Sequence, residues 1–500
     1  MERKAKSGIM LILLIISMLT LAFNVQPAKA SGIIYIRADG SVQGTDNITS
    51  VDNVTYTFTG NIFDAIVVER DNIVVDGAGY MLQGTGILVS NGIDLSGRSN
   101  VTIQNINIKE FVNGIQLGSS FNCTVKGNNV TNGYYGILLY ESSNNSINGN
   151  NITANNEEGI SLTYSSYNRV HGNNITANNW NGIDLAFSSN NSVSGNYIAA
   201  NSMAGIVLRF SSSNNSMNGN DVTANNETGI YLRGSSYNGI EGNNITANLG
   251  DGICLRESSN DNSINKNNIT TNSGSGIGLE SSSNNSVSEN NITNDYSGIS
   301  LTTYSSYNRV QRNNITNNEF GVSLIYSSDN SIYHNNFIDN TIQASASEGT
   351  PTNFLDDGYP SGGNHWSDYT GVDEFSGPNQ NQPGTDGIGD TPRIVDDYNV
   401  DYYPLMNQWA LKRAIQTSVK VGGQEYAILI ETNATLTHIR VTSVTLRFQS
   451  SGISGQTYYI NVTFPQINQT EINVFIDGER LTPPPFPIIT ANSTHYFIYF

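Results

Sequence analysis

The sequence predicts an all-β fold, a parallel β-helix with three short strands in each coil. The phrase Gly-Ile-x-Leu, once Gly-Val-x-Leu, occurs ten times between Gly114 and Gly321, which sets a repeat of about 23 residues. Within a repeat the apolar residues, such as Ile160, Leu162 and Val170, alternate with polar ones and are separated by Ser, Asn and Gly. This pattern favours strands of a few residues over helices. One repeat cannot bury its apolar side chains, but repeats stacked about 4.8 Å apart can.

The Asn-rich phrase Asn-Asn-Ile-Thr marks one turn of the predicted coil. It recurs at Asn150, Asn173, Asn243, Asn267, Asn290 and Asn313. Stacked asparagines can bond side chain to side chain along a column and can satisfy the backbone groups of the turn. The residue before the phrase is Gly in early coils but Lys266, Glu289, Arg312 and His334 in later ones. We therefore expect that this position does not require a positive φ angle.

The first thirty residues have the pattern of a secretory signal. Basic residues precede the apolar run 9–23, and the small residues that follow favour cleavage after Ala30. The run is shorter than a membrane anchor of about 18 residues, so we expect an exported chain with no membrane span in its mature form. Residues 31–70 are β-rich but off the repeat, and they are predicted to cap a helix that occupies residues 71–345.

Beyond the repeats, residues 346–410 form an acidic tail with several aromatic side chains. Trp366 and neighbouring tyrosines are predicted to pack over the open end of the last coil, which would otherwise present unpaired strands. Between residues 351 and 403 there are ten Asp and Glu residues and one basic residue, Arg393. That excess of carboxylates suggests a cation.

The tail also contains a candidate calcium site. In the loop 384–390 the glycines allow a tight turn in which Asp386 and Asp390, together with Asp373, could converge on Ca²⁺. The loop is not an EF-hand, because Thr391 replaces the required glycine. The alternative is a solvated acidic loop without a metal.

The C-terminal region changes from short repeats to strands of ordinary length. Residues 415–500 alternate apolar and polar side chains over several segments, which predicts a small β-sandwich. The chain ends within the apolar segment 496–500, which leaves open a continuation of the natural chain beyond Phe500.

The overall charge bears on possible partners. The chain has a formal net charge of −19, from 42 acidic and 23 basic residues, which disfavours nucleic acid as a partner. An exported acidic protein with a long repetitive face instead suggests a glycan or a cell-envelope component.

One row of outward side chains stands out on the Gly-Ile-x-Leu strands. Arg209, Arg233 and Arg256 fall at the same position on three consecutive coils, about 4.8 Å apart. Like charges at this spacing repel, and acidic neighbours can offset the repulsion, so a purely structural role is one interpretation. The other is a clamp for an acidic glycan, in which Asp184 and Tyr231 on the adjacent row contact hydroxyls or stack on sugar rings.

Catalysis is not favoured by the residue pattern, and no catalytic residue is predicted. Hydrolysis requires two carboxylates on neighbouring coils, and the third position of the Gly-Ile-x-Leu phrase holds one carboxylate in ten repeats. Acidic residues such as Glu157 and Glu158, which precede the strand, are expected to be solvated turn residues.

The tail carries a more specific signature than the repeats. It consists of Gly363-Asn364-His365-Trp366-Ser367-Asp368-Tyr369, Asp386-Gly387-Ile388-Gly389-Asp390-Thr391-Pro392 and Asp401-Tyr402-Tyr403-Pro404-Leu405. With the repeats, these segments resemble the NosD-like right-handed parallel β-helix proteins, and the archaeal cell-surface members in particular. His365 stands where the motif usually has an aromatic residue.

The resemblance implies a right-handed helix, export, and kinship with β-helix domains that bind carbohydrates or hydrolyse sugars. Its namesake is a periplasmic accessory of copper-site maturation. That role cannot be transferred residue by residue, because the five histidines are scattered and soft copper ligands need to cluster.

Three functions therefore stand as hypotheses. The first is a non-catalytic cell-surface protein that binds glycans or envelope components, with calcium as the only cofactor suggested. The second is a secreted polysaccharide lyase, epimerase or hydrolase. The third, suggested by the family name alone, is the copper accessory function.

Overall fold

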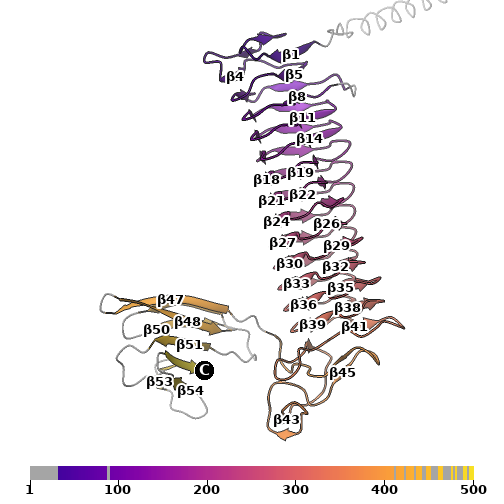
Figure 1. Ribbon diagram of the computed structural model, residues 1–500, viewed down its shortest axis with the longest axis vertical. Helices are drawn as coiled ribbons and strands as arrows, with labels where there is room; N and C mark the ends of the chain where they lie inside the picture. The colour runs from indigo at the N-terminus through magenta and orange to yellow at the C-terminus, as the bar shows by residue number, and fades with distance from the viewer. Residues whose placement is uncertain are drawn as a thin grey trace, which may run out of the picture. The chain divides into compact units, whose positions relative to one another are not determined.

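The structure is a computed structural model that describes residues 32–86 and 90–409 and, between residues 413 and 499, the backbone of several strands. The regular secondary structure of the described residues consists of β-strands. The chain folds into a right-handed parallel β-helix with about 23 residues per coil (Figure 1). The predicted fold class is confirmed. The predicted signal, residues 1–30, lies outside the described residues.

The first sheet contains the Gly-Ile-x-Leu strands. Its order is β2-β1-β5-β8-β11-β14-β17-β20-β23-β26-β29-β32-β35-β38-β41, and neighbours pair in parallel except β1 with β2. The strands are β1 (Ile33–Ile36), β2 (Val42–Gln43), β5 (Ala65–Val68), β8 (Ile93–Asp94), β11 (Asn113–Gly118), β14 (Tyr135–Tyr140), β17 (Ile160–Thr163), β20 (Ile183–Ala186), β23 (Ile206–Arg209), β26 (Ile230–Arg233), β29 (Ile253–Arg256), β32 (Ser275–Glu280), β35 (Ser297–Thr302), β38 (Phe320–Ile325) and β41 (Ile342–Ala346).

The second sheet contains the strands that begin within the Asn-rich phrase. It runs from β7 to β42 in steps of one coil. Its strands are β7 (Met81–Gln83), β10 (Asn107–Lys109), β13 (Asn129–Thr131), β16 (Asn151–Thr153), β19 (Asn174–Thr176), β22 (Tyr197–Ala199), β25 (Asp221–Thr223), β28 (Asn244–Thr246), β31 (Asn268–Thr270), β34 (Asn291–Thr293), β37 (Asn314–Thr316), β40 (Asn336–Ile338) and β42 (His365–Trp366).

The third sheet supplies the remaining strand of each coil. It runs from β3 to β39, and only β3 with β4 is antiparallel among its described pairs. Its strands are β3 (Ile48–Thr49), β4 (Thr55–Phe58), β6 (Val74–Asp76), β9 (Thr102–Gln104), β12 (Thr124–Lys126), β15 (Ser146–Asn148), β18 (Arg169–His171), β21 (Ser192–Ser194), β24 (Ser216–Asn218), β27 (Gly239–Glu241), β30 (Ser263–Asn265), β33 (Ser286–Ser288), β36 (Arg309–Gln311) and β39 (Ser331–Tyr333).

The core is a set of aliphatic columns that run through the coils. Ile160, Leu162, Val170 and Ile175, which belong to one coil, are all fully buried. Each pairs in register with an aliphatic residue of the next coil, as Ile160 does with Ile183. Burial of such side chains contributes about 1.5–3 kcal/mol each, so a small contribution is repeated in every coil.

Asparagine columns hold the turns, as the sequence predicts. The Asn150 amide nitrogen Nδ2 donates to Asn173 Oδ1 at 3.0 Å and to the Val125 carbonyl oxygen at 2.9 Å. Two further columns of this kind pass through Asn145 and Asn155. Because these side chains are buried, each needs partners for its polar atoms, and the adjacent coils provide them.

The prediction for the residue before the Asn-rich phrase is wrong. Its φ angle is positive in the coils with glycine, as at Gly149 (61°), and also at Lys266 (54°), Glu289 (58°) and Arg312 (58°). The left-handed conformation costs a residue with a Cβ roughly 1–2 kcal/mol. The hydrogen bonds of the adjacent Asn column fix the turn in spite of that cost.

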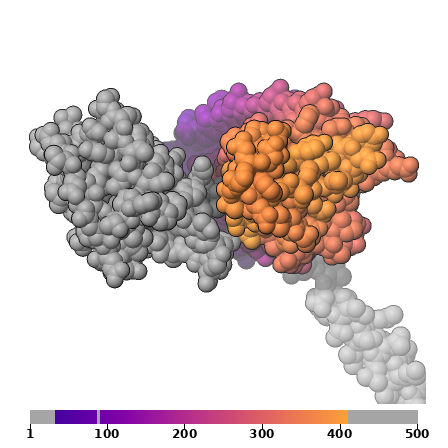
Figure 2. Space-filling model, turned by 90° about the horizontal axis from the view of Figure 1, so that it is seen from below, coloured from indigo at the N-terminus to yellow at the C-terminus, as the bar shows by residue number. Residues whose placement is uncertain are grey.

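Residues 310–314, 331–339 and 353–500 make a second compact unit, separate from the rest of the chain. Within it β42 pairs in parallel with β40, and the Trp366 ring stacks on Phe337 with centroids 4.4 Å apart. Trp366 Nε1 donates to Asp401 Oδ2 at 2.8 Å. The tail residues, orange in Figure 2, gather into a continuous surface. Trp366 thus packs on Phe337, an aromatic side chain of β40 in the β-helix. Tyr402, one of the neighbouring tyrosines, is exposed.

Short antiparallel pairs complete the tail, and longer strands form the C-terminal region. The tail pairs are β43 (Phe375–Ser376) with β44 (Gln382–Pro383) and β45 (Arg393–Ile394) with β46 (Val400–Asp401). The C-terminal strands are β47 (Arg413–Val421), β48 (Gln424–Thr432), β49 (Thr435–Val441), β50 (Leu446–Ser451), β51 (Ile460–Pro465), β52 (Phe475–Ile476), β53 (Glu479–Arg480), β54 (Ile488–Ala491) and β55 (His495–Tyr499). They pair in antiparallel sheets, with β47-β48-β51-β55-β54 as the largest. No helix long and apolar enough to cross a membrane is found in the described part of the chain.

Candidate functional site

The outer surface of the first sheet carries the residues that the sequence singles out. Strand pairing aligns Arg209, Arg233 and Arg256, the arginine row. It also aligns Asp184, Val207, Tyr231 and Cys254, the inner row, which holds the third residue of each Gly-Ile-x-Leu phrase. The predicted register of both rows is confirmed.

Arg209 and Asp184 form an ion pair in which the carboxylate is buried and the arginine is partly exposed. Arg209 Nε lies 3.0 Å from Asp184 Oδ1, and Nη2 donates to Oδ2 at 3.1 Å. The Asp184 side chain is 0% exposed. Burial raises the pKa of Asp184, and the Arg209 guanidinium opposes that shift. Asp184 therefore has no exposed atom with which to contact a sugar, and it orients Arg209 instead.

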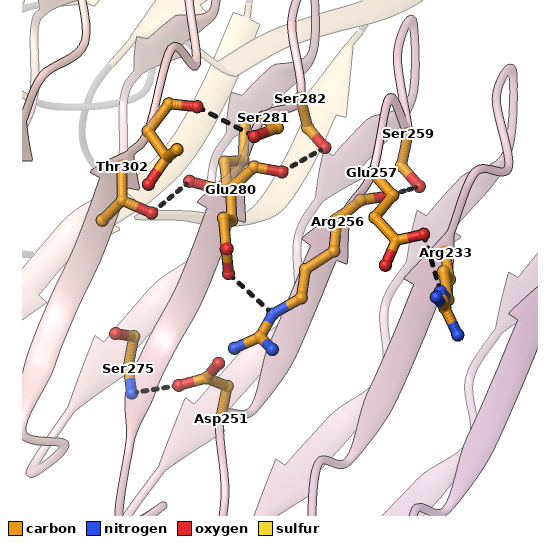
Figure 3. Close-up of polar contacts among 12 residues, drawn as sticks. Arg233, Asp251, Arg256, Glu257, Ser259, Ser275, Glu280, Ser281, Ser282 and Thr302 are labelled. Carbon is orange, nitrogen blue, oxygen red and sulfur yellow. Dashed lines mark hydrogen bonds and ion pairs between the residues drawn. The ribbon is translucent and has the colours of Figure 1, made fainter.

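Arg233 and Arg256 pair with glutamates one coil further along (Figure 3). Arg233 Nε lies 2.8 Å from Glu257 Oε2, and Arg256 Nε lies 3.0 Å from Glu280 Oε2. Both arginines are about half exposed, at 47% and 48% of the side chain. In Figure 3 the terminal nitrogens point away from these carboxylates. Each glutamate thus holds one edge of a guanidinium at Nε, and the terminal nitrogens lie on the other edge; the Arg256 guanidinium also lies near the Cys254 thiol.

Tyr231 lies between Val207 and Cys254 in the inner row and is half-buried. Burial raises its pKa above the usual value. Cys254 beside it is buried, and burial, with Asp251 nearby, raises the pKa of its thiol to about 12. The inner row is therefore largely covered, and Tyr231 is its partly accessible member among these four residues.

The structure also brings together an acidic cluster that sequence reasoning missed. Glu158, expected to be solvated, is 4% exposed, and burial, followed by the nearby charge of Asp184, raises its pKa to about 7. Tyr135, one coil earlier, has its pKa raised to about 12 by burial and then by Glu158. The position of Glu158, directly before the phrase glycine, does not by itself give its burial, because Asp251 at the same position of a later coil is only partly buried. Asn181 and Ala204, at the same position in later coils, are buried.

An exposed set of aromatic rings lies beside the arginine row. Tyr140, Tyr164, Phe187 and Phe210, which we call the aromatic ladder, belong to four consecutive coils. Tyr164 and Phe187 stack with centroids 4.8 Å apart, and Phe187 and Phe210 with centroids 5.0 Å apart. The Arg209 guanidinium carbon lies 5.3 Å from the Phe210 centroid. All four residues are exposed, between 42% and 50%, and adjacent exposed aromatic rings are less common on a protein surface than single ones.

The predicted calcium ligands accept backbone hydrogen bonds in this structure. Asp373 accepts from the amides of Asp386 and Gly387, and Asp390 accepts from those of Glu374 and Phe375. Among the described residues no three His, Cys, Asp or Glu side chains are grouped so as to hold a metal ion. In this arrangement Asp373 and Asp390 accept hydrogen bonds that close the loop.

Two family descriptions match parts of the chain. "Right handed beta helix region" matches residues 91–245, and "Periplasmic copper-binding protein (NosD)" matches residues 248–371. The second match includes the start of the tail signature. The chain is a NosD-like right-handed β-helix protein.

Three solved structures are similar to the chain at low identity. The periplasmic alginate epimerase AlgG is 14% identical over 63% of this chain and 84% of its own, with a TM-score of 0.36. The A-module of the mannuronan C-5 epimerase AlgE4 from Azotobacter vinelandii is 16% identical over 65% and 90%, with a TM-score of 0.37. The Dettilon tailspike protein is 14% identical over 87% and 83%, with a TM-score of 0.36. No curated protein sequence matches the chain. At these TM-scores the three structures imply nothing about function.

Proposed function

We propose that the protein is exported and binds a glycan of the cell envelope on the outer surface of the first sheet, without catalysing a reaction. The observation that supports this proposal is the paired arrangement of Arg233 and Arg256, each held at Nε by a carboxylate and half exposed. The two guanidinium groups present their terminal nitrogens from adjacent coils (Figure 3). The "periplasmic" description of the matched family is consistent with export.

The geometry suits an extended saccharide better than a small ligand. Neighbouring coils repeat about every 4.8 Å, a spacing close to the length of one sugar unit. Guanidinium groups donate hydrogen bonds in a planar fork that fits carboxylate, sulfate or paired hydroxyl oxygens. A chain lying parallel to the helix axis would therefore meet the same donor once per coil.

Binding is tested by titrating the protein with acidic and neutral oligosaccharides in a calorimeter, after a glycan array has selected the best binders. We expect Arg233→Ala to fold normally and to weaken binding about tenfold, the loss of one charge-assisted hydrogen bond. Arg169→Ala removes the same charge from β18 in the third sheet and is the matched control. Equal affinity of the Arg233 and Arg169 variants would show that the arginine row serves only the scaffold.

A second function, catalysis on a polysaccharide, has one observation in its favour. Glu158 and Asp184 are neighbouring carboxyl groups in different environments, one with a pKa of about 7 and one paired with Arg209. Two carboxyl groups with such different environments can serve as a general acid and its charged partner in catalysis. Both are almost completely buried, however, so a substrate has little access to them. Incubation with uronate polysaccharides, monitored by the ultraviolet absorbance of unsaturated products and by reducing ends, distinguishes lyase and hydrolase activity from binding alone, and NMR of the polymer detects epimerisation.

A further inference from the structure

The aromatic ladder ends abruptly at Phe210. Arg209 is in register with Arg233, so the coil after Phe210 continues with Gly234 where the ladder would continue. Phe187 stacks on one face of Phe210. Gly234 has no side chain with which to continue the stack, and the Arg209 guanidinium carbon lies 5.3 Å from the Phe210 centroid.

The backbone does not require glycine at position 234. Its φ angle of 55° is matched by Phe187 (53°), Phe210 (57°) and Glu257 (52°), which follow the equivalent strands of other coils and all carry side chains. A Cβ atom added to Gly234 would meet only the Glu257 carbonyl oxygen, at an ordinary contact distance of 3.5 Å. The absence of a side chain at this position therefore leaves a gap in the ladder that the fold itself does not demand.

Two polar side chains flank Gly234: Arg233 precedes it in the chain, and Glu257 holds the equivalent position in the next coil. Arg233 and Glu257 form an ion pair, and their side chains are 47% and 59% exposed. The pair joins Arg233 Nε to Glu257 Oε2, so the Arg233 terminal nitrogens can donate, and Glu257 Oε1 can accept, a hydrogen bond from a ligand. Phe210 thus lies one coil before Gly234 and Glu257 one coil after it, and the Arg233–Glu257 pair supplies a donor and an acceptor with no net charge.

We propose that this gap is a subsite for one pyranose ring of the bound glycan. This inference rests on the proposed function and adds the position and the chemistry of one sugar unit. The apolar C–H face of a pyranose stacks on an aromatic ring, and its edge carries hydroxyls that both donate and accept hydrogen bonds. The Arg233–Glu257 pair has no net charge and offers both functions, so the ring in this subsite contacts it through hydroxyl groups. Carboxylates or sulfates of an acidic glycan lie on other units.

The test fills the gap. Gly234→Phe extends the ladder by one ring in a conformation that Phe187 and Phe210 already adopt. Thr303→Phe is the matched control, because Thr303 is exposed and has a φ angle of 48° after the equivalent strand of a distant coil. Affinities are measured by calorimetry with oligoalginate, oligogalacturonate and cello-oligosaccharides, and folding is checked by circular dichroism and thermal melting.

We expect Gly234→Phe to lower the affinity at least tenfold and Thr303→Phe to leave it unchanged. Phe210→Ala, which removes the platform, gives the same loss and decides the question if Gly234→Phe does not fold. Wild-type affinity in Gly234→Phe or Phe210→Ala, together with weaker binding in Arg233→Ala, would refute the subsite but not the proposed function. If the wild-type protein binds none of these glycans, the proposed function fails, and the subsite with it.

Discussion

Replacing Asp295 by asparagine should stabilise the helix. Asp295 occupies a position that is asparagine in the neighbouring coils, between Asn272 and Asn318 of one buried column. Its Oδ1 accepts from the Asn272 backbone amide at 2.6 Å and from Asn272 Nδ2 at 3.1 Å. Its Oδ2 is buried and has no hydrogen-bond partner among the described residues. At the equivalent atom, Asn318 Nδ2 donates to Asn340 Oδ1 and to the Ile292 carbonyl oxygen. A carboxylate oxygen can donate neither bond.

The size of the effect follows from the pKa. Burial raises the pKa of Asp295 from 3.8 to about 7, although its hydrogen bonds from Asn272 oppose the shift. The folded state therefore holds a proton that the unfolded state releases between about pH 4 and pH 7, so this contribution to stability is complete at low pH and is lost as the pH rises through about 7. The difference corresponds to roughly 4 kcal/mol at high pH, as an order of magnitude. Asp295→Asn has no such proton to lose.

Urea denaturation followed by circular dichroism at pH 4 and pH 8 measures the effect. We expect Asp295→Asn to raise the urea midpoint clearly at pH 8 and little at pH 4. The mirror variant Asn318→Asp, in the same column, should lower the midpoint at pH 8 and much less at pH 4. If Asp295→Asn is less stable than the wild type at pH 8, or shifts both midpoints equally, the buried carboxyl group has a partner and the reasoning is wrong.

Three further expectations concern titration and metals. Glu158→Gln should also raise the melting temperature above pH 7 and not at pH 4, because burial raises the Glu158 pKa to about 7; an equal shift at both pH values would show that ionisation of the buried carboxyl group is not the cause. Calcium binding through Asp373, Asp386 and Asp390 stays a prediction, and it requires a heat of binding in calorimetry and a melting temperature that EDTA lowers. If neither is seen, the backbone hydrogen bonds alone close the loop. Copper binding is expected to be absent or adventitious, and a tight stoichiometric Cu(I) complex of the mature protein would overturn that expectation.

The sequence is sufficient to predict the coil and the alignment of residues between coils. A repeat of about 23 residues fixes which residues stack, so the register of Arg209, Arg233 and Arg256 follows directly from counting. Counting does not reveal burial. Glu158 looks like a turn residue in the sequence, yet it is buried, whereas Asp251 at the same position of a later coil is only partly buried. Similarly, the positive φ angle at Lys266 depends on the hydrogen bonds of the turn, and the residue type at that position does not predict it.

The acidic partners of the three arginines could not be predicted from the repeat either, because they depend on the direction in which each side chain points. Arg209 turns back to Asp184 on the preceding coil, whereas Arg233 and Arg256 reach forward to glutamates on the following one. Stacking alone predicts neither direction. The acidic partners offset the repulsion between adjacent guanidinium groups, as a structural role requires. Among the three arginines, Arg209 is paired with a fully buried carboxylate. The other two pairs are exposed and individually contribute little to stability, typically about 0–1 kcal/mol. Arg209 is therefore best explained by its role in the scaffold. Arg233, one coil beyond the last ring of the aromatic ladder, and Arg256 are the half-exposed members of the row that can contribute to binding.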